Sequence, residues 1–377
     1  MPTKLLPGDP APWFSARASN NPKFAFSAAA GRYIVLTFVR SGVAPQDKST
    51  IAEINKGSRV FDDVHSGWFI VTADVGDEGT GSLPLRFPGI RAFFDGNNAI
   101  RGLFGIDAWG NGPVSMVLSP RLQILSVIAD EDPATHAKHL LDYVRSAIPL
   151  SALSEVYGPA PIMIIPNIFE PEFCRMLIAD YEKQGGGQSG FMVEENGKTV
   201  GKFDSKHKVR KDWLIQDDKI KQDIQSRIMR RIVPEIRKGY NFNVTRMERY
   251  IVSCYEADDG GHFSAHRDNT TKGTAHRRFA CSINLNAEDF EGGNLRFPEF
   301  GPQVYRPPTG GCVIFGCSLL HEATTVTKGK RYAFLPFFYD EAAAEIRKQN
   351  MDFVEIPQGQ GAPPPPATQD TAAVAAS

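Results

Sequence analysis

Hydrophobic residues form continuous runs in the first part of this chain and alternate with polar residues in the second part. Residues 33–39 and 68–73 are almost wholly apolar, as in strands that a sheet buries on both faces. Residues 48–61 and 133–148 instead show helical spacing. The segment 114–128 holds two apolar runs separated by a turn, which predicts a hairpin. Strand, helix, strand, hairpin and helix in this order predict an α/β domain.

The second part is predicted to contain short strands at regular intervals. Apolar or alternating segments lie at 281–286, 294–297, 312–315 and 331–337, with glycine and proline in the turns between them. This pattern is typical of an antiparallel sandwich or barrel. The sequence therefore predicts an α/β domain followed by an α+β domain.

Helices are predicted to support the barrel. An apolar strand at 162–165 begins this part, and 170–184 suits an amphipathic helix that ends at glycines 185–187. Isoleucines then recur every four residues, which predicts a supporting helix with an apolar stripe. They are Ile220, Ile224, Ile228, Ile232 and Ile236.

The length of 377 residues is enough for two ordinary domains. We predict a first domain over 1–150, a second over 151–340 and a tail over 341–377. The tail is rich in proline and alanine from 359 onward, so it is predicted to be disordered.

Charge and cysteine content narrow the class of protein. The chain has 42 Lys+Arg against 43 Asp+Glu, so neither nucleic acid nor an anionic membrane is expected as a partner. No apolar run approaches the ~20 residues of a membrane helix, and the N-terminal residues lack the core of a secretion signal. The odd number of cysteines, 5, is typical of reduced thiols, so we expect a cytoplasmic protein.

Four residues after 255 are candidates for a metal and co-substrate site. His266 and Asp268 lie two residues apart, and His321 follows in a polar stretch between two predicted strands. Two imidazoles and one carboxylate on one face of a metal leave positions open, which suits non-haem Fe(II) that activates O2. Arg331 follows, and its planar guanidinium can pair with both oxygens of a carboxylate, which favours a dicarboxylate co-substrate. We expect His266 and His321 to lie on opposite walls of the barrel.

Each candidate has an alternative interpretation. A His-x-Asp tripeptide alone is weak evidence for a metal site. Tyr255 is explained equally well as a core aromatic residue and as a residue of the site. Lys328 and Lys330 are the alternatives to Arg331 if the register of the last strand differs. His262 and His276 are predicted to be solvated loop histidines. Two basic clusters are predicted to be solvated surfaces: Lys206, Lys208, Arg210 and Lys211, and Arg227, Arg230 and Arg231.

A set of motifs over about 161–340 resembles the 2-oxoglutarate- and Fe(II)-dependent dioxygenases, and within them the prolyl 4-hydroxylases. The matching residues are Tyr255, Gly260, His266-Arg267-Asp268, Leu285-Asn286, Gly292-Gly293, Phe297-Pro298, Gly310, Phe315, His321 and Gly329-Lys330-Arg331-Tyr332-Ala333. The resemblance implies a double-stranded β-helix, also called a jelly roll, with supporting helices. It also implies iron held by His266, Asp268 and His321, 2-oxoglutarate bound to iron and to Arg331, and Tyr255 on the same carboxylate. Ascorbate is expected as the reductant.

One departure from the prolyl 4-hydroxylases concerns Phe263, which stands where many members have a tyrosine.

The first half resembles the peroxiredoxins, which have a thioredoxin-like fold, through Pro7-Gly8-Asp9-Pro10-Ala11-Pro12 and the strand, loop and helix after it. In that family the loop carries a reactive cysteine. No cysteine precedes Cys174, so this half is interpreted as a scaffold, a substrate-docking module or the surface of a homo-oligomer.

We therefore expect an oxygenase that converts O2 and 2-oxoglutarate to succinate and CO2 while it hydroxylates an unactivated C–H bond. The acceptor is a prolyl residue of a peptide or protein, or a small molecule. A non-catalytic binding protein is the competing class, and the complete set of His266, Asp268, His321 and Arg331 argues against it. A thiol-dependent redox enzyme is disfavoured by the cysteine-free first half.

Overall fold

The first unit of the chain is built on one seven-stranded sheet in the order β2-β1-β5-β4-β3-β6-β7. The computed structural model describes residues 4–7, 9, 11–120, 122–147, 159–355 and 372–373. Contacts between Cα atoms divide the chain into 1–158 with 298–302, and 159–297 with 303–377. The predicted domain boundary after residue 150 falls within 148–158, which lie outside the described residues.

The three central strands of the first unit run parallel, and the hairpin after them runs antiparallel. The parallel strands are β3 (Tyr33–Val39), β4 (Ser66–Thr72) and β5 (Ile90–Phe94). The hairpin consists of β6 (Val114–Leu118) and β7 (Ile124–Ile128), and β6 pairs with β3. At the other edge lie β1 (Ser15–Ala18) and β2 (Asn21–Ala25).

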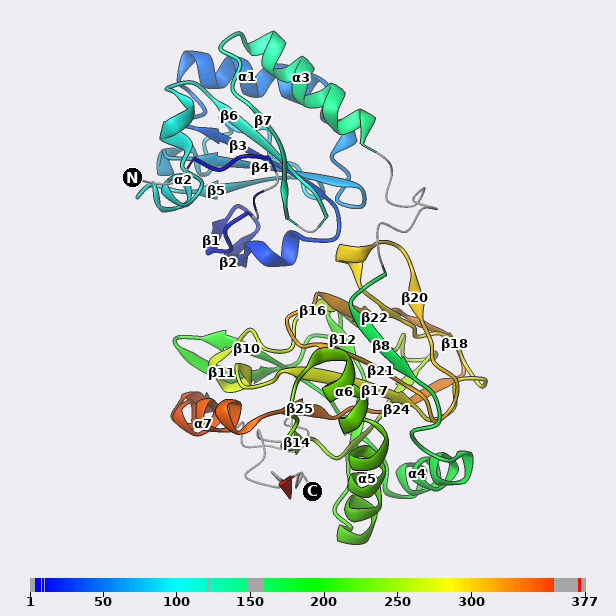
Figure 1. The fold of residues 1–377 in the computed structure, drawn as a ribbon. Coiled ribbons are helices and arrows are strands. Elements are labelled where there is room, and N and C mark those ends of the chain that lie inside the picture. The colour runs from blue at the N-terminus through cyan, green and yellow to red at the C-terminus, as the bar shows by residue number, and fades with distance from the viewer. Residues whose placement is uncertain are drawn as a thin grey trace. The chain divides into compact units, whose positions relative to one another are not determined.

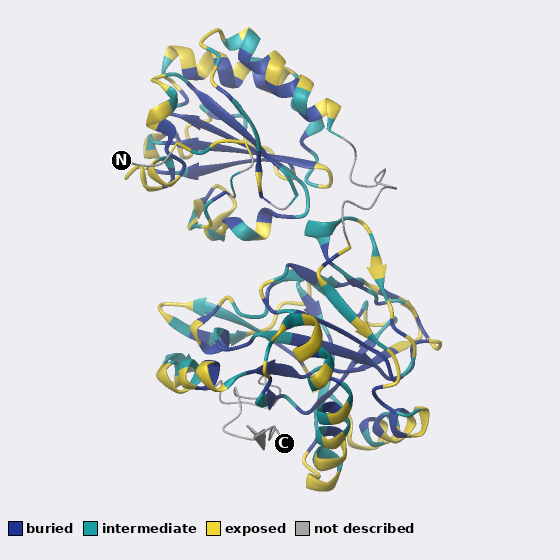
Figure 2. Ribbon diagram, viewed as in Figure 1, coloured by how far each residue is buried: buried dark blue, intermediate teal, exposed yellow. Residues whose placement is uncertain are grey.

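Helices α1 (Pro45–Lys56) and α3 (Pro133–Ser146) lie together on one face of this sheet, and the short α2 (Ala99–Leu103) follows β5 (Figure 1). The core under α1 and α3 includes Ile54, Trp68 and Leu140, all fully buried. Figure 2 shows the same division, because the central strands are buried and the outer helix faces are exposed. The apolar runs at 33–39 and 68–73 are thus buried strands, as predicted, and the unit has a thioredoxin-like fold.

The second unit contains a large sheet with the path β14-β25-β17-β24-β15-β13-β9, beyond which β27 (Ala372–Ala373) pairs with β14. Strand β21 also pairs with β17 and with β8. The strands of this sheet are β8 (Ile162–Ile165), β9 (Gly187–Gln188), β13 (Lys211–Leu214), β14 (Arg246–Glu248), β15 (Ile251–Glu256), β17 (Phe279–Asn284), β21 (Cys312–Gly316), β24 (Lys330–Phe334) and β25 (Phe337–Tyr339).

A smaller sheet has the order β12-β16-β22-β19-β20. Its strands are β12 (Lys208–Val209), β16 (His262–His266), β22 (His321–Ala323), β19 (Leu295–Arg296) and β20 (Val304–Tyr305). Every pairing within it is antiparallel. The chain passes repeatedly between the two sheets, which is the double-stranded β-helix expected from the sequence.

Helices α4 (Pro171–Gln184), α5 (Asp218–Arg231) and α6 (Val233–Tyr240) pack on the large sheet. The main core joins Leu177 of α4 and Ile228 of α5 to Val252 and Phe334 of the sheet, each fully buried. The remaining pieces are two small sheets, β10 (Phe191–Glu195), β11 (Lys198–Lys202) and β26 (Val354–Glu355) in one, and β18 (Glu291–Gly292) with β23 (Val326–Lys328) in the other. No helix in these described stretches is both long and apolar enough to cross a membrane.

Two sequence predictions about helices need correction. The isoleucine stripe is divided between α5 and α6, because Pro234 lacks an N–H and its ring excludes the preceding helical turn. Ile224, Ile228, Ile232 and Ile236 are nevertheless all fully buried, as the stripe predicts. The predicted tail begins too early at 341, since Glu341–Gln349 forms helix α7.

Helix α7 forms because its N-terminus is capped and one face is buried. The Asp340 side chain accepts a hydrogen bond from the Ala343 N–H, and Ala343 and Ala344 pack beside Tyr339. The proline-rich stretch after 355 lies outside the described residues, apart from 372–373.

Candidate active site

Two adjacent strands of the small sheet bring the predicted metal ligands together. His266 ends β16 and His321 begins β22, and the two residues face each other directly in the antiparallel register. Asp268 follows β16, with its carboxylate 3.5 Å from His266 Nε2 and 3.3 Å from His321 Nε2. One ligand atom of each residue lies within 4.8 Å of the others. The prediction that the histidines occupy opposite walls is wrong, because the chain between them leaves for other strands and returns beside β16.

Backbone carbonyls orient both imidazole rings. His266 Nδ1 lies 2.8 Å from the Ser264 carbonyl oxygen, and His321 Nδ1 lies 3.0 Å from that of Leu319. A carbonyl can only accept a hydrogen bond, so each Nδ1 carries a proton, and in the neutral ring the free lone pair is then on Nε2. Both Nε2 atoms lie beside Asp268, so this tautomer directs the two metal-binding nitrogens toward the same point as the carboxylate.

Burial keeps the cluster in the protonation states that suit metal binding. Burial, and then the neighbouring His321, lower the pKa of His266 to about 4, which leaves its imidazole neutral near pH 7. For Asp268, burial opposes ionisation, but His321 and His266 hold the pKa of the carboxyl well below its usual range. Asp268 therefore presents a carboxylate and His266 a neutral imidazole nitrogen, and both are groups that bind Fe(II).

Arg331 occupies the same pocket as these three residues. It is the second residue of β24 and lies opposite Tyr255 of β15, and only 2% of it is exposed. One guanidinium nitrogen donates to Ser282 Oγ at 2.8 Å and to Asn284 Oδ1 at 3.4 Å, while Nε has no hydrogen-bond partner. No carboxylate pairs with Arg331 in the described part of the chain. A buried cation without a counter-ion is costly, so the pocket is prepared for an anion.

Tyr255 links Arg331 to a second buried arginine. Its ring lies under the Arg331 guanidinium at 5.2 Å, and Arg210 Nη1 lies 3.3 Å from its hydroxyl. Arg210 in turn donates to Asp212 at 2.6 Å. The Tyr255 ring is 3% exposed and lines the pocket, so both interpretations of this residue, core aromatic and site residue, agree with its position.

The alternatives to Arg331 lie on the surface. Lys328 pairs with Glu291, and Lys330 lies 3.6 Å from both Glu182 and Glu256. Neither lysine lines the pocket.

The loop histidines behave differently from each other. His262 is half-buried, with its ring nitrogens near the carbonyls of Gly260 and Lys206. His276 is fully buried against Glu248 at 3.0 Å, so the prediction of a solvated loop residue is wrong for it. Glu248 also binds Arg277 at 2.7 Å, and this buried carboxylate explains why the imidazole is drawn inside.

The prediction of a solvated basic cluster is wrong for two of its members. Lys208 and Arg210 are each 5% exposed, because β12 pairs with β16 of the small sheet and β13 pairs with β15 of the large sheet. Lys208 Nζ donates to Ser189 Oγ at 2.7 Å and to the Gly190 carbonyl at 2.6 Å. The charged residues 208, 210 and 212 occupy every second position of the chain. Side chains with this spacing point to the same face of a strand, so the spacing was the signal in the sequence that these charges share one inward face. Sequence reasoning also missed Arg249, Ser282 and Asn284.

In the first unit, carboxylates stabilise the loop where a peroxiredoxin would carry its thiol. Ser41 N–H donates to Asp47 at 3.2 Å, and Gly42 N–H donates to Asp77 at 2.8 Å. Asp77 also accepts from the hydroxyls of Thr72 and Ser82. The N–H groups of Ser41 and Gly42 are thus bound to internal acids rather than left open to an external anion.

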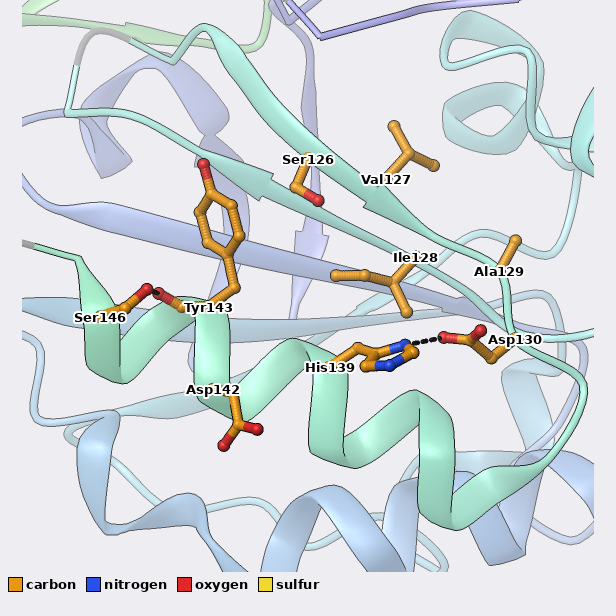
Figure 3. Close-up of a pocket in the computed structure, with 9 residues that line it drawn as sticks. All are labelled: Ser126, Val127, Ile128, Ala129, Asp130, His139, Asp142, Tyr143 and Ser146. Atoms are coloured by element: carbon orange, nitrogen blue, oxygen red, sulfur yellow. Dashed lines mark hydrogen bonds and ion pairs between the residues drawn. The ribbon is translucent and has the colours of Figure 1, made fainter.

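A surface hollow of the first unit lies between β7 and α3 (Figure 3). Its edge carries an ion pair between His139 and Asp130, 2.8 Å apart. No cysteine lines this hollow, so it offers no thiol for redox chemistry.

Comparison with known proteins adds to this geometry. Residues 250–339 match the model of the 2OG-Fe(II) oxygenase superfamily. A PKHD-type hydroxylase of Pseudomonas fluorescens is 37% identical over 114 residues, which are 28% of this chain and 49% of the relative. A PKHD-type hydroxylase of Synechococcus is 33% identical over 89 residues, which are 22% and 39% of the two chains. The chain thus spans about half the length, or less, of the curated relatives it matches.

Solved structures with similar parts were found for both units. A prolyl-4-hydroxylase of Pseudomonas putida is 15% identical with a TM-score of 0.38, over 51% of this chain and 97% of that chain. A bacterioferritin comigratory protein of Xanthomonas campestris is 18% identical with a TM-score of 0.30, over 35% and 90%. The family match places a 2OG-Fe(II) oxygenase domain in the second unit, over the strands that carry His266, Asp268, His321 and Arg331.

Proposed function

We propose that this protein is a dioxygenase that uses Fe(II) and 2-oxoglutarate to hydroxylate a C–H bond of a second substrate. The observation that carries the proposal is one pocket that holds both a convergent His266, Asp268 and His321 and the unpaired, buried Arg331. Two imidazoles and a carboxylate on one side of the metal leave positions open for O2 and a chelating co-substrate. The match to the oxygenase superfamily supports the same conclusion.

The residues have distinct roles in this proposal. His266, Asp268 and His321 would hold the metal, which when bound supplies the chemistry that converts O2 and 2-oxoglutarate to succinate and CO2 during hydroxylation. Arg331 would pair with the far carboxylate of 2-oxoglutarate, and Tyr255 would position that arginine through its ring. Ascorbate would keep the iron reduced.

Apolar rings surround the proposed metal site and limit the access of water. The Phe263 ring stacks on His266 with centroids 3.5 Å apart, and the Phe315 ring lies 4.5 Å from His321. A dry site strengthens electrostatic contacts and restricts side reactions. Phe263 therefore packs against a proposed ligand, and it cannot contribute the tyrosine hydroxyl found in many prolyl hydroxylases.

The acceptor that we propose first is a prolyl residue of a peptide or protein, and a small molecule is the alternative. Succinate formation with Fe(II), 2-oxoglutarate and ascorbate should rise several-fold when the acceptor is present, and the acceptor should gain one oxygen by mass spectrometry. Peptides that contain proline are compared with the same peptides that contain alanine, and with a panel of metabolites. Stimulation by a metabolite alone would assign the acceptor to the small-molecule class. Absence of any succinate would refute the proposed activity itself.

The first unit is proposed to act as a scaffold that sets oligomeric state or substrate access. We expect a fragment of residues 159–355 to retain slow succinate formation without acceptor, and to differ from the full chain in solution mass. The full chain should show no thiol-dependent peroxidase activity, because the first unit has no cysteine to form a sulfenic acid. A folded, iron-binding fragment that makes no succinate would instead place part of the first unit in the active site.

A cytoplasmic location belongs to the same proposal, since all five cysteines are free thiols.

A further inference from the structure

Arg249 lines the proposed active-site pocket, yet it has no part in binding the metal or 2-oxoglutarate. Arg249 lies between β14 and β15, beside Phe337, which follows the C-terminal end of β24. Arg331 lies near the N-terminal end of β24. Tyr255 pairs with Arg331 in the register of the large sheet, and Glu248 pairs with Phe337. The two arginines therefore lie beside opposite ends of β15, and a co-substrate bound to Arg331 leaves Arg249 available.

The backbone at Arg249 adopts a conformation that arginine rarely takes. Its φ is 71°, in the left-handed region that favours glycine and asparagine. Such a conformation costs free energy, and strained residues cluster at ligand sites. This turn directs the Arg249 guanidinium over the Phe337 ring, 5.3 Å from its centroid, and into the pocket lining.

Arg249 also lacks a carboxylate of its own. The acid nearest to it, Asp212, lies 3.6 Å away and already binds Arg210 at 2.6 Å. The hydroxyls of Ser189 and Ser253 donate to the same carboxylate at 2.6 and 2.7 Å. Asp212 is therefore occupied, and the Arg249 guanidinium makes no hydrogen bond within the described ranges.

Exposure distinguishes Arg249 from the other arginine on Asp212. The Arg249 side chain is 22% exposed, whereas that of Arg210 is 3% exposed. Arg210 is thus a buried structural partner of Asp212 and Tyr255, and Arg249 is the arginine that a molecule entering the pocket can reach.

Charge balance points in the same direction. Arg210, Arg249 and Arg331 line the pocket; Asp268 is the one acid among its described lining residues, and Asp212 pairs with Arg210 behind it. A divalent metal and a dianionic co-substrate carry equal and opposite charges, so the pocket keeps its excess of positive charge after both have bound. A group with one negative charge on the second substrate would balance it.

We propose that Arg249 binds a carboxylate of the substrate that is hydroxylated and so determines which substrates the enzyme accepts. This inference rests on the proposed oxygenase function and deepens it. The carboxylate belongs to a small acid or to an acidic peptide, and both sources present the same planar pair of oxygens to the guanidinium.

The test uses acetate as a minimal carboxylate and acetamide as its neutral counterpart. The full chain is loaded with Mn(II) and 2-oxoglutarate without oxygen, and broadening of the methyl proton signal by the paramagnetic metal is followed in NMR titrations. Acetate should show saturable broadening, acetamide should not, and Arg249→Gln should weaken the acetate effect at least tenfold. Arg246→Gln is the matched control, because this arginine pairs with Glu341 outside the pocket and should behave as the unmodified chain does.

Several results would overturn the assignment. Equal broadening by acetate and acetamide in the unmodified chain would exclude a carboxylate site, and this comparison does not depend on any variant. Equal acetate affinity in folded Arg249→Gln would exclude this arginine. Failure of Mn(II) to bind at all would instead refute the proposed metal site, and the inference with it. Displacement of acetate by N-acetyl-L-proline would assign the carboxylate to a small acid, and displacement by an amidated peptide with an internal glutamate would assign it to a peptide.

Discussion

Replacement of Asp268 by alanine should abolish succinate formation and most of the Fe(II) binding. Asp268 is the only anionic member of the cluster with His266 and His321, and both imidazole nitrogens lie within 3.5 Å of its carboxylate. Loss of a residue that merely supports a metal ligand typically costs about 10- to 100-fold in affinity, so loss of a charged ligand should cost more. Anaerobic titration with Fe(II) and a succinate assay measure the two effects.

The control for this variant is Asp259→Ala. Asp259 pairs with Lys211, is 44% exposed at its side chain and does not line the pocket. It should bind iron and make succinate as the unmodified chain does. Thermal melting of both variants checks that each is folded. Iron affinity that survives unchanged in folded Asp268→Ala would remove this residue from the metal site.

The metal cluster could be predicted from the sequence because it depends on few residues in a recognisable order. The positions of these ligands could not be predicted as well, since the chain from Asp268 to His321 runs through β17, β18, β19, β20 and β21, which belong to three sheets. Only the observed pairing of β16 with β22 shows that the histidines are neighbours. The order and spacing of residues therefore identified the metal ligands, but they did not predict which strands pair or in which register.

The buried charges were harder to predict than the ligands. The segment 206–212 has the composition of a solvated loop, and the burial of Lys208 and Arg210 follows from the position of β12 and β13 beside β16 and β15. The pairing of Arg210 with Asp212 makes that burial tolerable, because each charge has a partner. His276 is a similar case, since Glu248 draws it inside from another strand. Long-range partners decide these positions, and local sequence does not reveal them.

Breaks in helices and strands were harder to predict than the metal ligands but easier to predict than the buried charges. The division between α5 and α6 follows from Pro234, a residue visible in the sequence, although the periodic isoleucines suggested one continuous helix. In the last strand, Pro336 separates β24 from β25, so the predicted strand 331–337 is two strands. Apolar periodicity thus identified the buried face correctly, and proline determined where the hydrogen bonding stops.

Replacement of Arg331 by glutamine should leave Fe(II) binding in place and weaken 2-oxoglutarate. The guanidinium is buried, and its Nε has no partner, so it has hydrogen-bonding capacity left for a carboxylate. Hydrogen bonds to charged groups contribute about 1.5–3 kcal/mol, which corresponds to about 10- to 150-fold in affinity. The apparent affinity is measured from succinate formation as a function of 2-oxoglutarate concentration, and from anaerobic binding to the metal-loaded chain.

Lys330→Gln and Lys328→Gln are the matched controls for Arg331→Gln, because they remove a positive charge from neighbouring positions of the same hairpin. Both lysines pair with glutamates at the surface, so their loss should change the affinity for 2-oxoglutarate by less than about twofold, as expected for exposed ion pairs. A weaker co-substrate in Lys330→Gln with normal affinity in Arg331→Gln would reverse the assignment. Since strand side chains alternate between faces, that outcome would require the register of β24 to be shifted by one residue against β15. The same measurement therefore tests the role of Arg331 and the strand pairing that places it in the pocket.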